Sequence, residues 1–202
     1  IQPDELKPEM ILGARLLHVD GHDAAAAAQV AAWARQRGML VTADVDNIYP
    51  GLDALLENVD YLISSESFPS AATGESDLFR ALERLSTRYR MKLVGATLGH
   101  HGVLALTDDS FLYEPAYKVT CRDTTGAGDV FHGAFIYGLL QDWPMSRTLD
   151  FSCAMAGLNC TALGARGGIA TVAVAERLMA AGRRHPPRWP QLPTLSHAGG
   201  GR

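Results

Sequence analysis

A glycine-rich turn that runs into an apolar helix is the most constraining feature of this chain. Residues 123–129 read DTTGAGD and are followed by VFHGAF. Because Gly126 and Gly128 keep side chains away, the backbone N–H groups from Gly126 through Ala127 and Gly128 to Asp129 can close around a phosphate, whose charge the helix N-terminus favours. Asp129 stands where a hydroxyl approaching that phosphate would lose its proton. The stretch therefore predicts an anion site with a base beside it.

The composition is typical of an α/β enzyme. The chain has 202 residues, 47% of them hydrophobic and 20% charged, which is enough to bury one sizeable core. A formal net charge of -4 gives no basic field for nucleic acid. Cys121, Cys153 and Cys160 are too few and wrongly spaced for a disulfide framework or a zinc site. With no apolar run that could span a membrane and no signal peptide, we expect a cytoplasmic protein without nucleic-acid or membrane partners.

Strand and helix patterns alternate along the first half of the chain. The expected strands are residues 16–19, 40–43, 61–63 and 93–97, and the expected helices are residues 23–37, 52–58 and 75–90. Such alternation predicts a mostly parallel sheet that binds ligands at the carboxyl ends of its strands.

The pattern changes after residue 97. The expected elements are an antiparallel hairpin of residues 103–106 and 111–113 and two helices, residues 126–140 and 146–163, that are apolar nearly all round. We expect residues 1–182 to form the folded part. Residues 183–202 are rich in proline and glycine, so we expect them to be a disordered tail in which Trp189 is exposed.

The motif D-T-T-G-A-G-D-x-F-x-x-A-F resembles the C-terminal signature of the ribokinase-like (PfkB) carbohydrate kinases. The resemblance runs in order from about Arg15 to Thr171. It implies a three-layer α/β/α sandwich and transfer of the ATP γ-phosphoryl group to a hydroxyl of a sugar or sugar-like substrate. Asp129 would be the base, and the Gly126–Asp129 backbone would be the anion hole. Family members carry roughly a hundred further residues before Ile1, so we expect the N-terminal part and the lid to be missing. The resemblance allows a homodimer for the full-length protein.

A second glycine-rich segment bears on nucleotide binding. Residues 97–102 resemble the T-L-G-x-x-G loop that touches ATP in the family, and they comprise Thr97, Leu98, Gly99, His100, His101 and Gly102. A glycine-rich turn into a hairpin needs no ligand, so this segment alone is a weak signal. We expect the two imidazoles to point to opposite sides of the turn. By resemblance, Cys153 would lie near the adenine.

A third segment resembles the part of the family that holds a monovalent cation beside the anion site. The residues so implied around potassium are Asp123, Thr125, Asn159, Ala162, Gly164 and Gly168. A glycine-rich helix exit explains residues 159–168 nearly as well.

The chain departs from the family pattern after the strand at residues 61–63. Many relatives carry N-x-x-E there, which organises magnesium and phosphate. Here Ser65 falls in the place of the Asn and Phe68 in the place of the Glu, and Glu66 is at most a displaced substitute. Phosphoryl transfer from ATP still requires Mg²⁺, and Asp44 is a further candidate for holding it. This departure keeps open a non-catalytic nucleotide-binding scaffold, and a nucleoside acceptor is a further alternative.

Overall fold

A six-stranded sheet forms the centre of the molecule. The computed structural model describes residues 1–108 and 110–195. The strands are β1 (Leu16–Asp20), β2 (Leu40–Val45), β3 (Tyr61–Ser65), β4 (Leu93–Thr97), β5 (Val103–Thr107) and β6 (Phe111–Glu114). They lie side by side in sequence order; β1 to β4 are parallel, whereas β5 and β6 are antiparallel to their neighbours. The predicted parallel sheet and hairpin are confirmed.

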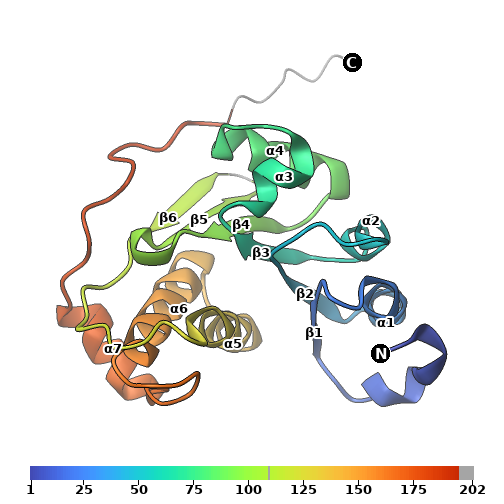
Figure 1. The fold of residues 1–202 in the computed structure, drawn as a ribbon, viewed down its shortest axis with the longest axis horizontal. Coiled ribbons are helices and arrows are strands. Elements are labelled where there is room, and N and C mark those ends of the chain that lie inside the picture. Colours follow the sequence, from blue (N-terminus) through green and yellow to red (C-terminus); the bar gives the residue numbers. More distant parts are fainter. Residues whose placement is uncertain (109, 196–202) are drawn as a thin grey trace.

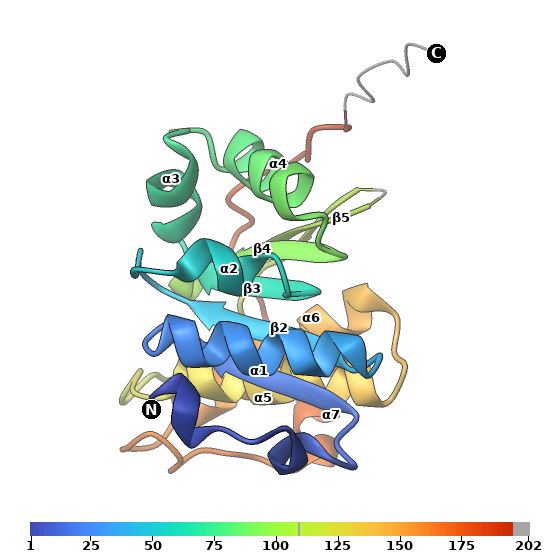
Figure 2. The same ribbon diagram turned by 90° about the vertical axis from the view of Figure 1, so that its right-hand side faces the viewer.

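Helices cover both faces of the sheet, as Figures 1 and 2 show. The first layer holds α1 (Ala24–Gln36), α2 (Leu52–Leu56), α3 (Phe68–Thr73) and α4 (Leu78–Tyr89); the second holds α5 (Ala127–Leu140), α6 (Met145–Asn159) and α7 (Val172–Ala181). Short 3₁₀ turns are Pro3–Glu5, Pro8–Ile11 and Gly99–His101. The predicted three-layer α/β/α sandwich is therefore confirmed. The sequence pattern did not predict α3 or α7, and α6 ends at Asn159 rather than at residue 163.

Each layer of helices has its own apolar core against one face of the sheet. In β4, Leu93 and Val94 are both fully buried although successive side chains point to opposite faces. Val94 belongs to the core under α1 to α4, and Leu93 belongs to the core under α5 to α7. This two-sided burial explains why the central strands read as continuous apolar runs rather than as alternating ones.

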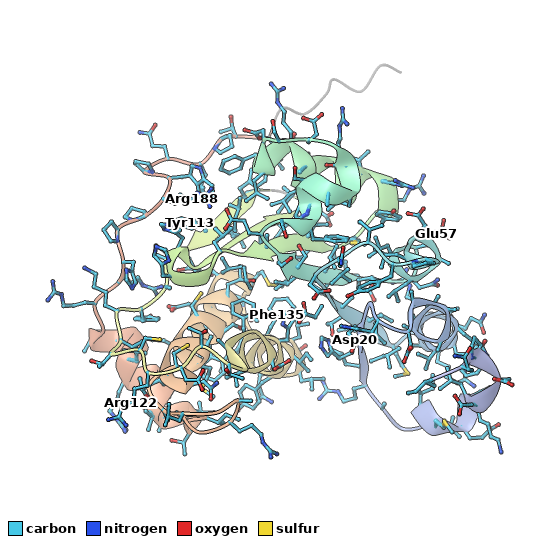
Figure 3. The ribbon with its side chains drawn as sticks, viewed as in Figure 1. Asp20, Glu57, Tyr113, Arg122, Phe135 and Arg188 are labelled. Atoms are coloured by element: carbon cyan, nitrogen blue, oxygen red, sulfur yellow. The ribbon has the colours of Figure 1, made fainter. Side chains whose placement is uncertain are left out.

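Polar residues gather where the parallel strands end. Asp20 at the end of β1 pairs in register with Asp44 in β2, and Ser65 at the end of β3 pairs with Thr97 at the end of β4. Because the strands are parallel, all four residues lie at the same end of the sheet, where the carboxyl ends of the strands meet. Figure 3 labels Asp20, which ends β1.

Residues 183–195 differ from the expectation of disorder, because they pack against the rest of the chain. The Nη2 atom of Arg184 lies 2.5 Å from Oδ1 of Asp150. The ring of Trp189 packs edge-on against Phe79 and Tyr113, with ring centroids 5.1 and 5.3 Å apart. Figure 1 shows the segment running from α7 past β6 toward α4. Residues 196–202 of the predicted tail lie outside the described residues.

No helix in the described part of the chain is long and apolar enough to cross a membrane.

Candidate active site at the start of α5

The predicted glycine-rich turn forms the N-terminus of α5. Gly126 caps the helix with a φ of 75° in the left-handed region. A Cβ atom on Gly126 would stand 2.4 Å from the carbonyl oxygen of Ala165. Glycine is therefore required at this position by both the backbone conformation and the close approach of the α6–α7 connection.

The free N–H groups at this turn differ slightly from the predicted set. The N–H of Ala127 already donates to the carbonyl oxygen of Thr124 at 3.1 Å, so it is not available to an anion. The N–H groups of Gly126, Gly128 and Asp129 have no hydrogen-bond partner within the described residues. These three groups, at the positive end of a 14-residue helix, form the part of the turn that can bind an anion.

Asp129 lies exposed in the first turn of α5. Its charge is close enough to influence the titration of both His18 on β1 and Asp44 on β2. A carboxylate at this place is accessible to a hydroxyl compound bound over the strand ends.

His132, one turn further along α5, joins the helix to the sheet. Its Nδ1 lies 2.9 Å from the carbonyl oxygen of Gly128 and 3.3 Å from Oδ2 of Asp44. Its Nε2 lies 3.1 Å from the carbonyl oxygen of Ile63. The imidazole is 5% exposed, so these contacts are shielded from water. They fix the start of α5 against the ends of β2 and β3.

Loss of hydration shifts the pKa values of two further groups, Asp44 on β2 and His18 on β1. Burial is the largest cause that raises the pKa of Asp44, and the nearby His132 acts in the opposite direction. Desolvation, followed by His132, lowers the pKa of His18 to about 4. His18 belongs to an edge strand and is open to solvent on one side, while its Nδ1 lies 2.9 Å from Oγ1 of Thr42 on the other.

A cavity of about 390 Å³ lies beside the turn; Thr97 at the end of β4 lines it, whereas Asp20, Asp44 and Asp129 do not. Thr124, Ala127, Gly128 and Phe131 line it from the α5 side. Its other walls come from the β4–β5 loop, residues 116–121, α6 and the C-terminal segment. The N-terminus of α5 thus borders a cavity of cofactor size, and the carboxylates at the ends of β1 and β2 do not line that cavity.

The predicted nucleotide loop lies at this cavity, but two of its residues, Leu98 and His101, do not line it. Thr97, Gly99, His100 and Gly102 line the cavity, whereas Leu98 is 3% exposed and packs in the core. A Cβ on Gly102 would be 1.9 Å from the carbonyl oxygen of Glu114, so the loop must be glycine there. The imidazoles of His100 and His101 do not point to opposite sides, because their ring centroids are 3.9 Å apart. Cys153 also lines the cavity.

The predicted magnesium position is not built as a metal site. Glu66 forms an ion pair with Arg188, and Phe68 is completely buried at the start of α3. Ser65 does not line the cavity; its hydroxyl contacts the carbonyl oxygen of Asp46 and the hydroxyl of Ser67. No group of three or more His, Cys, Asp or Glu residues placed to hold a metal ion occurs within the described ranges. These side chains do not fit a protein-held Mg²⁺ ion.

Most of the predicted monovalent-cation residues do come together. Oδ1 of Asp123 accepts hydrogen bonds from the N–H and hydroxyl of Thr125, and Oδ2 accepts one from the N–H of Gly164. The bond from the Thr125 N–H is the largest cause that lowers the pKa of Asp123. The buried Asn159 side chain bonds the carbonyl oxygen of Thr125 and the N–H of Gly168. The N–H of Ala162 donates to the carbonyl oxygen of Asn159 at 3.4 Å.

The oxygen atoms in this cluster are of the kind that an alkali cation prefers, namely a carboxylate and backbone carbonyls. The residues Asp123, Thr125, Asn159 and Gly164 thus lie together. Because Gly164 contributes its N–H and the Asn159 amide nitrogen contacts the Thr125 carbonyl oxygen, a cation bound here stays a prediction.

Sequence reasoning missed His132, Phe131, Tyr117 and His185. His132 is a polar residue on an otherwise apolar helix, and that contrast could have marked it. The cavity-lining residues carried no such signal, because their role depends on contacts between distant parts of the chain.

A model of the pfkB family of carbohydrate kinases matches residues 4–171. A ribokinase from Lactococcus lactis subsp. lactis is 32% identical over 120 residues, which cover 57% of this chain and 37% of that protein.

Solved structures of the same fold are similar over most of the chain. A ribokinase from Arabidopsis thaliana complexed with ribose and ATP has a TM-score of 0.77 at 23% identity and covers 85% of this chain and 58% of that one. Phosphofructokinase-2 from Escherichia coli in complex with potassium has a TM-score of 0.73 at 19% identity, with 86% and 60% covered. The chain thus spans less than two thirds of the length of these relatives.

Proposed function

Because the chain belongs to the pfkB family of carbohydrate kinases, we propose that the protein carrying it transfers the γ-phosphoryl group of ATP to a hydroxyl group of a sugar or sugar-like acceptor. The observation that carries this proposal is the position of the α5 N-terminus. It borders a cavity of about 390 Å³, and His132 in the same helix contacts Asp44 at the end of β2, so donor and acceptor would meet at Gly126–Asp129.

Asp129 would accept the proton of the attacking hydroxyl, or orient it, as the new P–O bond forms. The free N–H groups of Gly126, Gly128 and Asp129 would hold the negative charge that gathers on the transferring phosphoryl group. Charge stabilisation of this kind contributes several kcal/mol when water is excluded, on the order of 3 kcal/mol per donor.

Two ions belong to this proposal in different ways. Mg²⁺ supplies charge neutralisation of the ATP phosphates, and the described residues offer it no cluster of their own. We therefore assign no protein ligand to it. A potassium ion at Asp123 and Thr125 would support the same turn, because Thr125 immediately precedes the Gly126 cap.

A second candidate function is nucleotide binding without transfer. The observation in its favour is the loss of a free carboxylate at the end of β3, where Glu66 is paired with Arg188 and Phe68 is buried. Asp129 and the free N–H groups favour the kinase.

The test is ATP-dependent phosphorylation across a panel of sugars and nucleosides by the full-length protein, with Mg²⁺ and K⁺ present. In Asp129→Asn, kcat should fall by a factor on the order of 10³ while the KM for ATP stays within about threefold. Asp4→Asn, an exposed aspartate near the N-terminus, is the matched control and should leave kcat unchanged. ATP binding without turnover of any acceptor would favour the non-catalytic function.

A further inference from the structure

The C-terminal segment, residues 183–195, contributes to the cavity although it lies outside the part that the family model matches. That match ends at residue 171, yet His185 lines the cavity. The segment is therefore a feature of this chain that the family signature does not describe.

Backbone hydrogen bonds hold this segment against the cavity wall. The N–H of Lys118 donates to the carbonyl oxygen of Arg183 at 2.7 Å, and the N–H of His185 donates to that of Ala116 at 2.9 Å. Residues 183–185 thus run antiparallel to residues 116–118, with a bridge between Tyr117 and Arg184. Two such bonds fix both the register and the direction of the side chains.

The side chain of Arg184 anchors the segment from one side. Its guanidinium group contacts Oδ1 of Asp150 at 2.5 Å, the hydroxyl of Tyr117 at 2.6 Å and the carbonyl oxygen of Pro115 at 2.6 Å. Since neighbouring side chains in extended backbone point to opposite sides, the anchored Arg184 turns His185 the other way, into the cavity.

His185 meets a second imidazole at the cavity. The ring centroids of His185 and His100 are 5.8 Å apart in an edge-to-face arrangement, and both residues line the cavity. Burial is the largest cause that lowers the pKa of His185. Lys118, His100 and His101 act in the same direction. The ring is therefore uncharged at neutral pH and offers a flat aromatic surface rather than a phosphate-binding charge.

The same cavity contains the glycine turn of α5, at Gly128. A nucleotide whose phosphates lie at that turn must place its base elsewhere in the cavity, and planar aromatic rings bind bases by stacking.

We propose that His185 is a base-binding residue, with which the C-terminal segment extends the nucleotide site to contact the adenine ring of ATP. This inference rests on the proposed function, since it takes the cavity to be the ATP site.

The test is calorimetric titration of the full-length protein with Mg²⁺–ATP and, separately, with inorganic tripolyphosphate. His185→Ala should weaken ATP binding about five- to thirtyfold and leave tripolyphosphate binding unchanged, because only ATP carries a base. His185→Phe keeps an aromatic ring and should bind ATP within about threefold of the parent. Gln191→Ala, exposed on the same segment and outside the cavity lining, should bind both ligands as the parent does.

Three other results would overturn this inference, and they can be told apart. If the parent binds ATP and His185→Ala binds it equally tightly, this inference fails and the proposed function stands. Equal weakening of ATP and tripolyphosphate would place His185 at the phosphates instead. A parent protein that binds no ATP would overturn the proposed function itself. If His185→Ala does not fold, the NMR signal of the His185 ring in the parent replaces it: ATP must shift that signal and tripolyphosphate must not.

Discussion

The Nδ1 atom of His132 lies 3.3 Å from the Oδ2 atom of Asp44, so a buried imidazole and a carboxylate connect α5 with the end of β2. All the polar partners of this imidazole are acceptors, since the other two are the carbonyl oxygens of Gly128 and Ile63. A neutral imidazole has only one N–H to donate. A neutral imidazole therefore cannot donate to all of these partners while Asp44 is ionised, beneath the proposed phosphoryl-transfer site.

Replacement of His132 by Ala should destabilise the protein by about 2–4 kcal/mol, because it leaves a cavity and removes the donor to the carbonyl oxygen of Ile63. The loss should depend on pH. Burial raises the pKa of Asp44 above its ordinary 3.8, and His132 opposes that rise, so the pKa should rise further in the variant. A carboxyl group with a raised folded-state pKa favours folding below its ordinary pKa and loses that contribution as pH rises through the folded value.

Urea unfolding of His132→Ala should therefore show a larger deficit at pH 6 than at pH 4. His22→Ala, an exposed histidine after the end of β1, is the control and should change stability by less than about 0.5 kcal/mol at both pH values. An equal deficit at pH 4 and pH 6 would mean that the pKa of Asp44 does not depend on His132.

The glycine turn could be predicted from the sequence because its chemistry is local: the cap, the free N–H groups and Asp129 all lie within four consecutive residues. The contacts of His132 could not, because Ile63 and Asp44 are distant in the chain and meet α5 only through the sheet. Local composition also misled. Residues 183–195 are rich in proline, but Arg184 and Trp189 find partners on α6, β6 and α4 that no local pattern reveals.

Gly126→Ala should destabilise the protein by about 2–4 kcal/mol, since it places a side chain at positive φ and against the carbonyl oxygen of Ala165. Gly133→Ala in the same helix is the matched control. Gly133 has ordinary helical backbone, and a Cβ there meets nothing within 4 Å, so alanine should stabilise the protein by up to about 1 kcal/mol. Thermal unfolding of both variants measures the contrast. Similar effects at the two positions would contradict the close approach of the α6–α7 connection.

Cys121 should be the first cysteine that N-ethylmaleimide modifies, and Mg²⁺–ATP should protect it. Cys121 is exposed and lines the cavity, whereas Cys153 is buried and burial raises the pKa of its thiol. Only the thiolate reacts, so Cys153 should react far more slowly. Saturating nucleotide should slow modification of Cys121 about tenfold or more, by occupancy of the cavity. Peptide mass spectrometry measures both rates. Unchanged labelling with ATP bound would place the nucleotide elsewhere.

Gly128→Ala separates ligand binding from folding at the same turn. Gly128 has no positive φ, and a Cβ there meets nothing within 4 Å, so the fold itself tolerates a side chain. Alanine is also the better helix former, so unfolding should show unchanged or slightly increased stability. Yet the residue lines the cavity, and its N–H group is one of those free to meet a phosphate. A methyl group there should hinder that approach and weaken Mg²⁺–ATP binding about tenfold or more, as calorimetric titration would measure. If the variant is stable and binds ATP as tightly as the parent, the phosphates do not lie at the start of α5.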